Sequence, residues 1–137
     1  MNRVRLSLRV RQAYPEQKPE MIRQTMEGTL ERLEDAWRIT YEETGEGMTG
    51  VISSIFLCSD GVILERTGAI RSTMVFRAGE QTAFTYGLDV GTMEMEIRTQ
   101  RLSWEITPSG GRLDMKYTVG FPGGEAGQMD YHLTVTR

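Results

Sequence analysis

Apolar and polar residues alternate strictly near the start of the chain, in RVRLSLRVRQ over residues 3–12. This two-residue period is typical of a half-buried β-strand, in which successive side chains point to opposite faces. The pattern therefore predicts a strand with one face turned toward a core and the other toward solvent. The core face holds Val4, Leu6, Leu8 and Val10, and the solvent face holds Arg3, Arg5, Arg9 and Arg11.

The same alternation returns along most of the chain. Turn-forming residues such as Asp60-Gly61 and Pro108–Gly111 separate the alternating runs, and Asp-Gly tolerates the positive φ of a hairpin turn. Short strands with tight turns predict an all-β fold, an antiparallel meander of about nine to eleven strands. The runs are clearest from Trp37, Val51, Ile70, Met93, Leu102, Leu113 and Met129.

One segment, GTLERLEDAW over residues 28–37, fits two structures. Three of its apolar residues have helical spacing, and its composition favours a helix. However, alternation resumes at once in Trp37, Ile39 and Tyr41, and the glycine at its start would weaken a helix interior. We therefore expect a hairpin with its turn at Glu34-Asp35.

Three motifs carry a resemblance to a known family. They are Arg66-Thr67-Gly68, the stretch Met74–Gly79 and Tyr86. In this order they resemble the arginine-glycine, M-x-F-x-x-G and tyrosine pattern of the YwiB-like family of uncharacterised bacterial proteins. The resemblance covers nearly the whole chain and implies a calycin-like or lipocalin-like meander barrel, closed or nearly closed, with no reaction or ligand attached. Family members often continue with x-T-P-x-G, where this chain has Leu88 and Asp89.

Length and composition narrow the class of protein. A chain of 137 residues, with 39% apolar and 26% charged residues, is typical of one soluble domain, which we expect to span residues 1–137. The net charge of −3 and the pI of about 5.3 argue against general nucleic-acid binding. Cys58 is the sole cysteine, so we expect no internal disulfide and a cytoplasmic location. Neither a signal peptide nor a membrane span is expected.

Candidate catalytic groups are few. One histidine and one cysteine do not make a conventional His/Cys metal site. Asp130 and His132 share a face of the last predicted strand, and a carboxylate could orient an imidazole base there, but the sequence places no nucleophile beside them. We expect an ordinary exposed pair and no cofactor or metal, so an enzyme is only the third hypothesis for this chain.

The inward positions of the predicted strands are rich in methionine and tyrosine. Flexible thioethers and phenols could line a ligand cavity, or they could simply fill the core. Arg66 shares the parity of Val62 and Leu64, which directs its guanidinium inward unless Gly68 marks a bulge. A buried arginine needs a partner, either within the protein or in an anionic ligand. The candidate ligand-binding residues are Arg66, Tyr41, Tyr86, Tyr117, Tyr131, Met74, Met95 and Met115, and Met93 and Met129 also occupy inward positions.

Two functional hypotheses stand ahead of an enzyme. The first is a small, partly apolar ligand in the lumen, acidic if Arg66 anchors it. The alternative is an interaction module whose outer surface contacts an acidic protein or RNA. A hollow lumen favours the ligand, and a filled lumen with a basic outer patch favours the alternative. We expect Glu94 and Glu96, or the Glu42-Glu43-Glu46 run, to neutralise the arginine stripe of Arg3, Arg5, Arg9 and Arg11.

Overall fold

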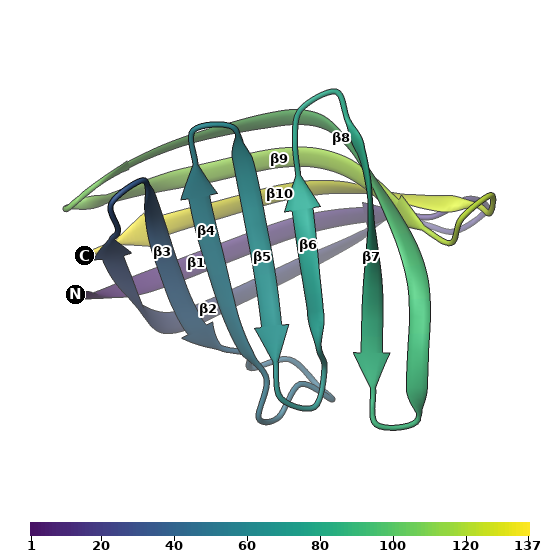
Figure 1. Ribbon diagram of the computed structural model, residues 1–137, viewed down its shortest axis with the longest axis horizontal. Coiled ribbons are helices and arrows are strands. Elements are labelled where there is room, and N and C mark those ends of the chain that lie inside the picture. Colours follow the sequence, from purple (N-terminus) through teal and green to yellow (C-terminus); the bar gives the residue numbers. More distant parts are fainter.

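The computed structural model describes all 137 residues and contains ten β-strands and no helix. Figure 1 shows the strands curling around a common interior. The all-β prediction and the expected number of strands are confirmed, and no helical segment long and apolar enough to cross a membrane is present. The strands are β1 (Asn2–Ala13), β2 (Glu20–Arg32), β3 (Ala36–Glu42), β4 (Ile52–Cys58), β5 (Gly61–Thr67), β6 (Ser72–Phe76), β7 (Gln81–Leu88), β8 (Gly91–Thr107), β9 (Gly110–Gly120) and β10 (Ala126–Thr136).

All ten strands belong to one antiparallel sheet, in the order β6-β5-β4-β3-β2-β1-β10-β9-β8-β7. Strands that follow one another along the chain are neighbours, and β1 also pairs with β10, which brings the two chain ends together (Figure 1). Val10 of β1, for example, lies between Tyr131 of β10 and Ile22 of β2. This connectivity is the predicted meander, wrapped into a nearly closed barrel.

The barrel closes incompletely between β6 and β7, a junction that we call the seam. A single bridge joins Arg71 and Gly87, whose amides donate to each other's carbonyl oxygens at 2.9 and 2.8 Å. The Thr82 hydroxyl adds one further bond across the seam, donating to the Val75 carbonyl oxygen at 2.6 Å. Every other junction is a ladder of at least five paired residues, so the seam is the part of the barrel wall with the fewest hydrogen bonds.

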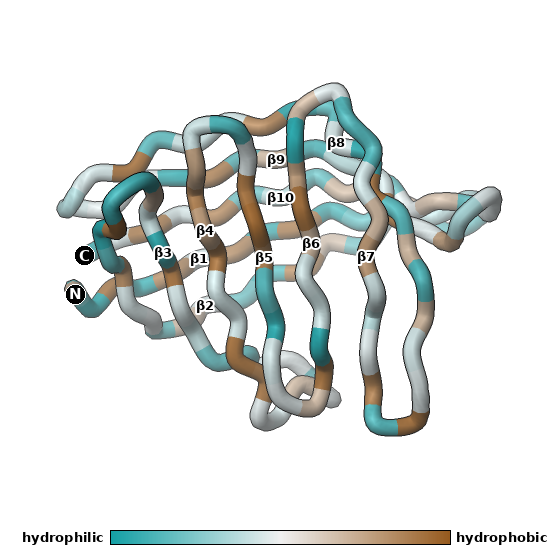
Figure 2. The backbone as a smooth tube through the Cα atoms, in the orientation of Figure 1, coloured by the Kyte–Doolittle hydropathy of each residue, from teal (hydrophilic) through white to brown (hydrophobic).

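Side chains from opposite walls meet inside the barrel. The core cluster contains 25 buried hydrophobic residues, and along β1 the buried and exposed positions alternate as predicted. Figure 2 shows the same alternation as short brown segments along the strands. Phe76 of β6 packs edge to face against Tyr117 of β9, with ring centroids 4.8 Å apart. Since β6 and β9 are not neighbours in the sheet, this contact spans the barrel interior.

The ambiguous segment forms the predicted hairpin. β2 ends at Arg32, β3 begins at Ala36, and the Leu33 amide donates to the Ala36 carbonyl oxygen at 2.8 Å around the Glu34-Asp35 turn. Gly28 lies in β2, where a Cβ atom would meet the Thr40 carbonyl oxygen at 2.5 Å. The glycine that weakens a helix is therefore required for close approach of β2 and β3.

β8 is the longest strand, with 17 residues, and its first residues, 91–95, pair only with β7, beside which they run in Figure 1. A register shift between Thr99 and Arg101 bends it around the barrel. The inward assignment of Met93 is wrong, because this end of β8 is paired only with β7 and the methionine is exposed. Met95 is half-buried, and Met129 is buried in the core.

Candidate functional site

Arg66 points into the barrel. It is paired in register with Ser53 of β4 and Ser72 of β6, which are both buried. Its Nε atom lies 3.5 Å from Oε1 of Glu43, and Nη1 donates to the Met74 sulfur at 3.9 Å. Gly68, which follows the end of β5, does not rotate the side chain outward. Arg66 therefore has an internal anionic partner, one of the two arrangements that its inward parity allowed.

Glu43 is the partner that sequence reasoning missed. Its side chain is 5% exposed, and it accepts a hydrogen bond from the Ser53 hydroxyl at 2.6 Å. Its own amide donates to the Val51 carbonyl oxygen at 2.9 Å, which fixes the backbone just beyond β3. The expectation that Glu43 neutralises the outer arginines is wrong because it keeps the inward parity of Tyr41. That parity was the available signal, hidden because Glu43 stands in one acidic run with Glu42 and Glu46.

Three predicted tyrosines surround this ion pair, and we call the group formed by Tyr41, Glu43, Ser53, Arg66, Tyr117 and Tyr131 the interior polar cluster. Burial and the Glu43 carboxylate raise the pKa of Tyr41. Burial raises the pKa of Tyr117 to about 12, although the Arg66 charge acts to lower it. Burial, followed by the neighbouring Tyr41 and Tyr117, raises the pKa of Tyr131 well above its ordinary value. All three phenols are therefore neutral groups in a dry environment.

Several polar atoms in this region lack a hydrogen-bond partner within the protein. They include the Tyr131 hydroxyl, the Ser72 hydroxyl and Nε of Arg66. A buried polar group without a partner costs about 1–3 kcal/mol. The interior polar cluster thus retains unused capacity to donate and accept hydrogen bonds.

The other predicted lumen residues divide between the core and the seam. Met74 and Met115 lie in the buried core cluster, whereas Tyr86 and Met95 are half-buried and pack against it. Arg66 borders a surface groove of about 710 Å³ near the seam. This groove has no hydrophobic lining residue and is formed by Glu65, Arg66, Thr67, Arg71, Ser72, Thr73, Thr85, Gly87 and Thr92.

The departure from the family's loop pattern also lies at the seam. Asp89 follows β7, and its Oδ1 atom is 3.7 Å from Nη1 of Arg71. The same guanidinium donates to the carbonyl oxygens of Gly68 at 3.3 Å and Leu88 at 3.5 Å. Arg71 thereby links the loop after β5 to the end of β7, next to its own backbone bridge to Gly87.

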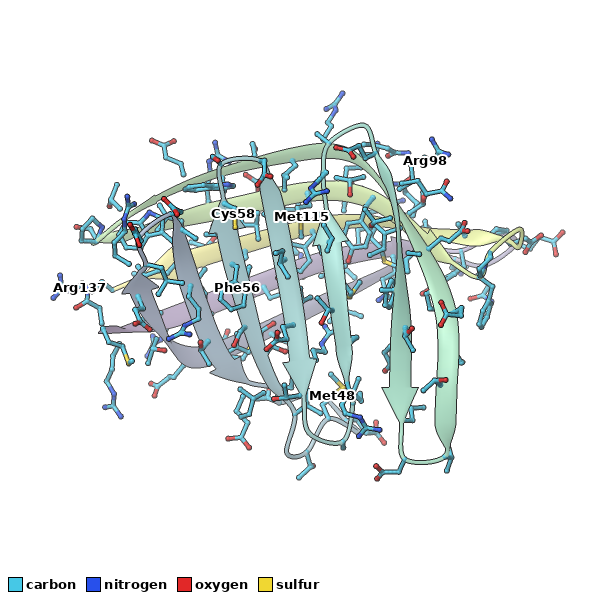
Figure 3. The ribbon with its side chains drawn as sticks, viewed as in Figure 1. Met48, Phe56, Cys58, Arg98, Met115 and Arg137 are labelled. Atoms are coloured by element: carbon cyan, nitrogen blue, oxygen red, sulfur yellow. The ribbon has the colours of Figure 1, made fainter.

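A second feature is the outer face of the sheet. Arg3, Arg5, Arg9 and Arg11 are exposed as predicted, and none forms an ion pair within 4.0 Å. The register places further cations from β2, β9 and β8 in the same outward rows. Figure 3 shows Arg137 projecting away from the barrel. We call this surface the basic face. Its rows hold Arg3, Arg5, Arg9, Arg11, Arg23, Arg101, Arg112 and Lys116, and Arg137, which follows β10, adjoins Arg3 and Arg5.

The predicted partners of the arginine stripe are wrong. Glu94 and Glu96 lie in β8 opposite Thr85 and Ala83 of β7, far across the sheet from β1. The acidic residues nearest to the stripe are instead Glu27, opposite Arg5, and Asp130, opposite Arg11. Alternation assigned the arginines to a face, but strand register decides which carboxylates lie beside them.

Two shallow grooves cross the basic face along β1. The first arginine groove, of about 480 Å³, is lined chiefly by Arg3, Arg5, Glu27, Thr29, Thr136 and Arg137. The second arginine groove, of about 340 Å³, is lined chiefly by Ser7, Arg9, Arg23, Thr25, His132 and Thr134. Each combines guanidinium groups with hydroxyl groups. Such donors suit an anionic group, because charge-assisted hydrogen bonds are stronger than neutral ones.

His132 has a different partner from the one expected. Its Nδ1 atom lies 2.7 Å from Oδ1 of Asp114, across the β9–β10 ladder. Arg112 binds the other carboxylate oxygen of Asp114. Partial burial acts to raise the pKa of Asp114, but the hydrogen bonds from His132 and Arg112 hold it below its ordinary value. The geometry is that of a surface ion-pair group, with no nucleophile among its members.

Comparisons with known proteins agree with the fold. The structure is similar to the crystal structure of the YwiB protein from Bacillus subtilis, with a TM-score of 0.85 and 17% sequence identity over 98% of this chain and 92% of that one. At this identity the similarity supports the shared fold. A comparison with functionally curated proteins finds no match. The family model described as a domain of unknown function, DUF1934, matches residues 6–133. The chain therefore belongs to the DUF1934 family of β-barrel proteins.

Proposed function

We propose that this protein is a non-enzymatic interaction module that binds an acidic protein partner through the basic face. The observation that carries the proposal is the exposure of the four β1 arginines, none of which forms an ion pair within the protein. Like charges opposite each other in a sheet are destabilising. Surface arginines held together without partners are more useful for recognition than for stability.

The distribution of charge supports the same proposal. On β1, β2, β8, β9 and β10, the outward rows that pass through residues 3–11 of β1 hold eight of the 16 Lys and Arg residues. Beside them stand four of the 19 Asp and Glu residues, Glu27, Glu105, Asp114 and Asp130. This face is therefore positive although the chain carries a net charge of −3. A local positive field attracts an acidic surface.

The first experiment measures binding of fluorescent poly-glutamate at low and physiological salt. We expect binding that weakens as salt rises, and its loss when Arg3, Arg5, Arg9 and Arg11 are all replaced by Gln. A matched control replaces Arg32, Arg71, Arg77 and Arg98, four exposed arginines outside the basic face, by Gln. Equal losses in the two variants, or no binding to any anionic polymer, would contradict the proposal.

A second candidate function is a lumen site for a small molecule. The unpartnered Tyr131 hydroxyl, Ser72 hydroxyl and Arg66 Nε favour it, because a ligand could complete their hydrogen bonds. Since Glu43 already offsets the Arg66 charge, the ligand would be uncharged, with one polar group and an apolar body that suits Met74 and Met115. The lumen site therefore favours an uncharged, partly apolar ligand over an acidic one.

Native mass spectrometry before and after denaturing extraction tests the lumen site. If a ligand is held there, the native protein carries a discrete extra mass, and Tyr131→Phe reduces its occupancy while the protein still folds. A native mass equal to the chain mass, together with equal or higher stability of Tyr131→Phe, would show that the hydroxyl binds no ligand.

A further inference from the structure

We infer that the partner of the basic face is an extended polypeptide segment with acidic residues at alternate positions. This inference rests on the proposed function and specifies the conformation and charge pattern of the partner. It is carried by the placement of the two arginine grooves along a single element, β1. A second observation is the absence of Phe, Tyr and Trp from the rows that surround it.

The spacing of the arginines sets the repeat of the partner. Arg3 and Arg5 line the first arginine groove, and Arg9 lines the second. Neighbouring same-face residues of a strand are about 6.6 Å apart, so Arg5 and Arg9 are about 13 Å apart and the stripe from Arg3 to Arg11 spans about 26 Å. Same-face side chains of an extended peptide have this same repeat. Carboxylates at positions i, i+2 and i+4 of such a peptide can therefore follow β1 from one groove to the other.

The chemistry of the grooves suits carboxylates. Arginine presents a planar fork of donors that matches a carboxylate, and each groove adds hydroxyl groups, from Thr29 and Thr136 in the first and from Ser7, Thr25 and Thr134 in the second. Glu27 borders the first groove and disfavours an acidic residue directly beside it. The second groove has Arg9 opposite Arg23 and no carboxylate in its lining, so it is the stronger anion site.

The same rows lack the large aromatic side chains on which the bases of single-stranded nucleic acids stack. Proteins that bind such strands combine cations with aromatic residues on which the bases stack. The outward positions beside the stripe hold no Phe, Tyr or Trp, and their one imidazole, that of His132, is bound to Asp114. From β2 and β10 they are Met21, Arg23, Thr25, Glu27, Thr29, Asp130, His132, Thr134 and Thr136. An acidic peptide needs only the charges and hydroxyls that are present.

The test uses three labelled probes of equal charge and measures fluorescence anisotropy at low salt. They are a peptide of about ten residues with alternating Glu and Ser, long enough to follow the stripe, its isomer with all Glu residues in one block, and an oligouridylate. The proteins are Arg3→Gln/Arg5→Gln, Arg9→Gln/Arg23→Gln and the charge-matched control Arg77→Gln/Arg98→Gln, whose arginines lie outside the basic face. Figure 3 shows the Arg98 side chain directed away from the barrel.

We expect the alternating peptide to bind the native protein most tightly. Each basic-face double variant should weaken it by about tenfold, with the larger loss in Arg9→Gln/Arg23→Gln, and the control should change it by less than about twofold. Equal affinity for both peptides would overturn the inferred charge pattern. Tighter binding of the oligouridylate, lost in the same variants, would overturn the peptide partner while leaving the basic face as a binding surface. If no probe binds, the proposed function itself fails.

A second copy of this chain is another molecule that could bind the basic face. Sedimentation of the unlabelled protein tests for it. Glu94 and Glu96 form one alternating acidic pair on β8. Salt-sensitive dimers that Glu94→Gln/Glu96→Gln abolishes would show that the basic face binds another copy, and would overturn an external peptide partner. A monomer that binds the alternating peptide supports the inference.

Discussion

Arg9 of β1 lies directly opposite Arg23 of β2 in the antiparallel ladder. On its other side Arg9 faces His132 of β10, whose imidazole is bound to Asp114. Neither arginine forms an ion pair within the protein. Two adjacent guanidinium groups with no anion between them oppose folding and attract an external anion, so stability and binding should respond in opposite directions when this pair is changed.

Replacing Arg23 by Glu tests this opposition. The change converts a like-charge cross-strand pair into an opposite-charge pair, and we expect the free energy of unfolding to rise by about 0.2–1 kcal/mol at low salt. Urea denaturation measures the change. Binding of the alternating acidic peptide should weaken in the same variant, because the second arginine groove gains a carboxylate.

Arg23→Gln is the control for this prediction. It removes the repulsion without adding attraction, so its stability should lie between those of the native protein and Arg23→Glu, and the differences should shrink at high salt. A loss of stability in Arg23→Glu at low salt would mean that Arg9 and Arg23 do not repel each other.

Replacing Arg66 by Met tests the buried ion pair. The substitution keeps an unbranched side chain of similar length but leaves Glu43 buried, with the Ser53 hydroxyl as its remaining hydrogen-bond donor. Breaking a buried ion pair from one side costs about 3–5 kcal/mol, and partial exposure of Arg66 places the expected loss near the lower end, at about 3 kcal/mol. Thermal or urea unfolding measures the loss.

The double variant Arg66→Met/Glu43→Gln separates charge from packing. Gln retains the shape of Glu and removes its charge, so the double variant should recover most of the stability lost by Arg66→Met. Equal losses in the single and double variants would show that Arg66 contributes through packing alone. An unchanged Arg66→Met protein would contradict the pairing with Glu43.

The alternation of the sequence predicts much of the barrel, because burial on one face is the strongest constraint on a half-buried strand. It correctly placed Tyr41 and Tyr131 inside and Arg3 outside. Closure of the barrel through the pairing of β1 with β10 follows from the family resemblance. Periodicity does not predict it, because alternation assigns side chains to the two faces of a strand and does not say which strands are neighbours.

The interior polar cluster was predictable only in part. Arg66 could be placed inside from its parity, but its partner depends on the path of the chain after β3, where Glu43 turns inward beside two acidic residues that do not. The neighbours of the arginine stripe depend on the register of β1 with β2 and β10. Both relationships join residues from different strands, and a one-dimensional pattern contains no information about their pairing.

Thr82→Val tests the strength of the seam. The substitution preserves shape and removes the hydroxyl that donates to the Val75 carbonyl oxygen across the junction of β7 and β6. We expect a loss of about 1 kcal/mol and faster amide hydrogen exchange in β6 and β7 than in the continuously paired β1. Thr85→Val is the control, since that hydroxyl bonds to Glu94 within the β7–β8 hairpin and does not cross the seam. Uniform exchange across all ten strands would contradict a weak seam.

The buried tyrosines predict loss of stability in alkaline solution. The folded-state pKa of Tyr117 is about 12, and those of Tyr41 and Tyr131 are also raised, in each case first by burial. An unfolded tyrosine loses its proton near pH 10. A phenol whose pKa is raised by folding contributes fully to the free energy of unfolding below that pH. As the pH rises from about 10 toward the folded-state pKa, this contribution is lost. The loss is about 1.4 kcal/mol per pH unit for each phenol. Urea unfolding at increasing pH should therefore show a steep decline, which Tyr117→Phe makes shallower. Phenolate absorbance of the folded protein should rise for the buried phenols only as the chain unfolds; complete ionisation near pH 10 with the fold intact would show that water reaches the interior polar cluster.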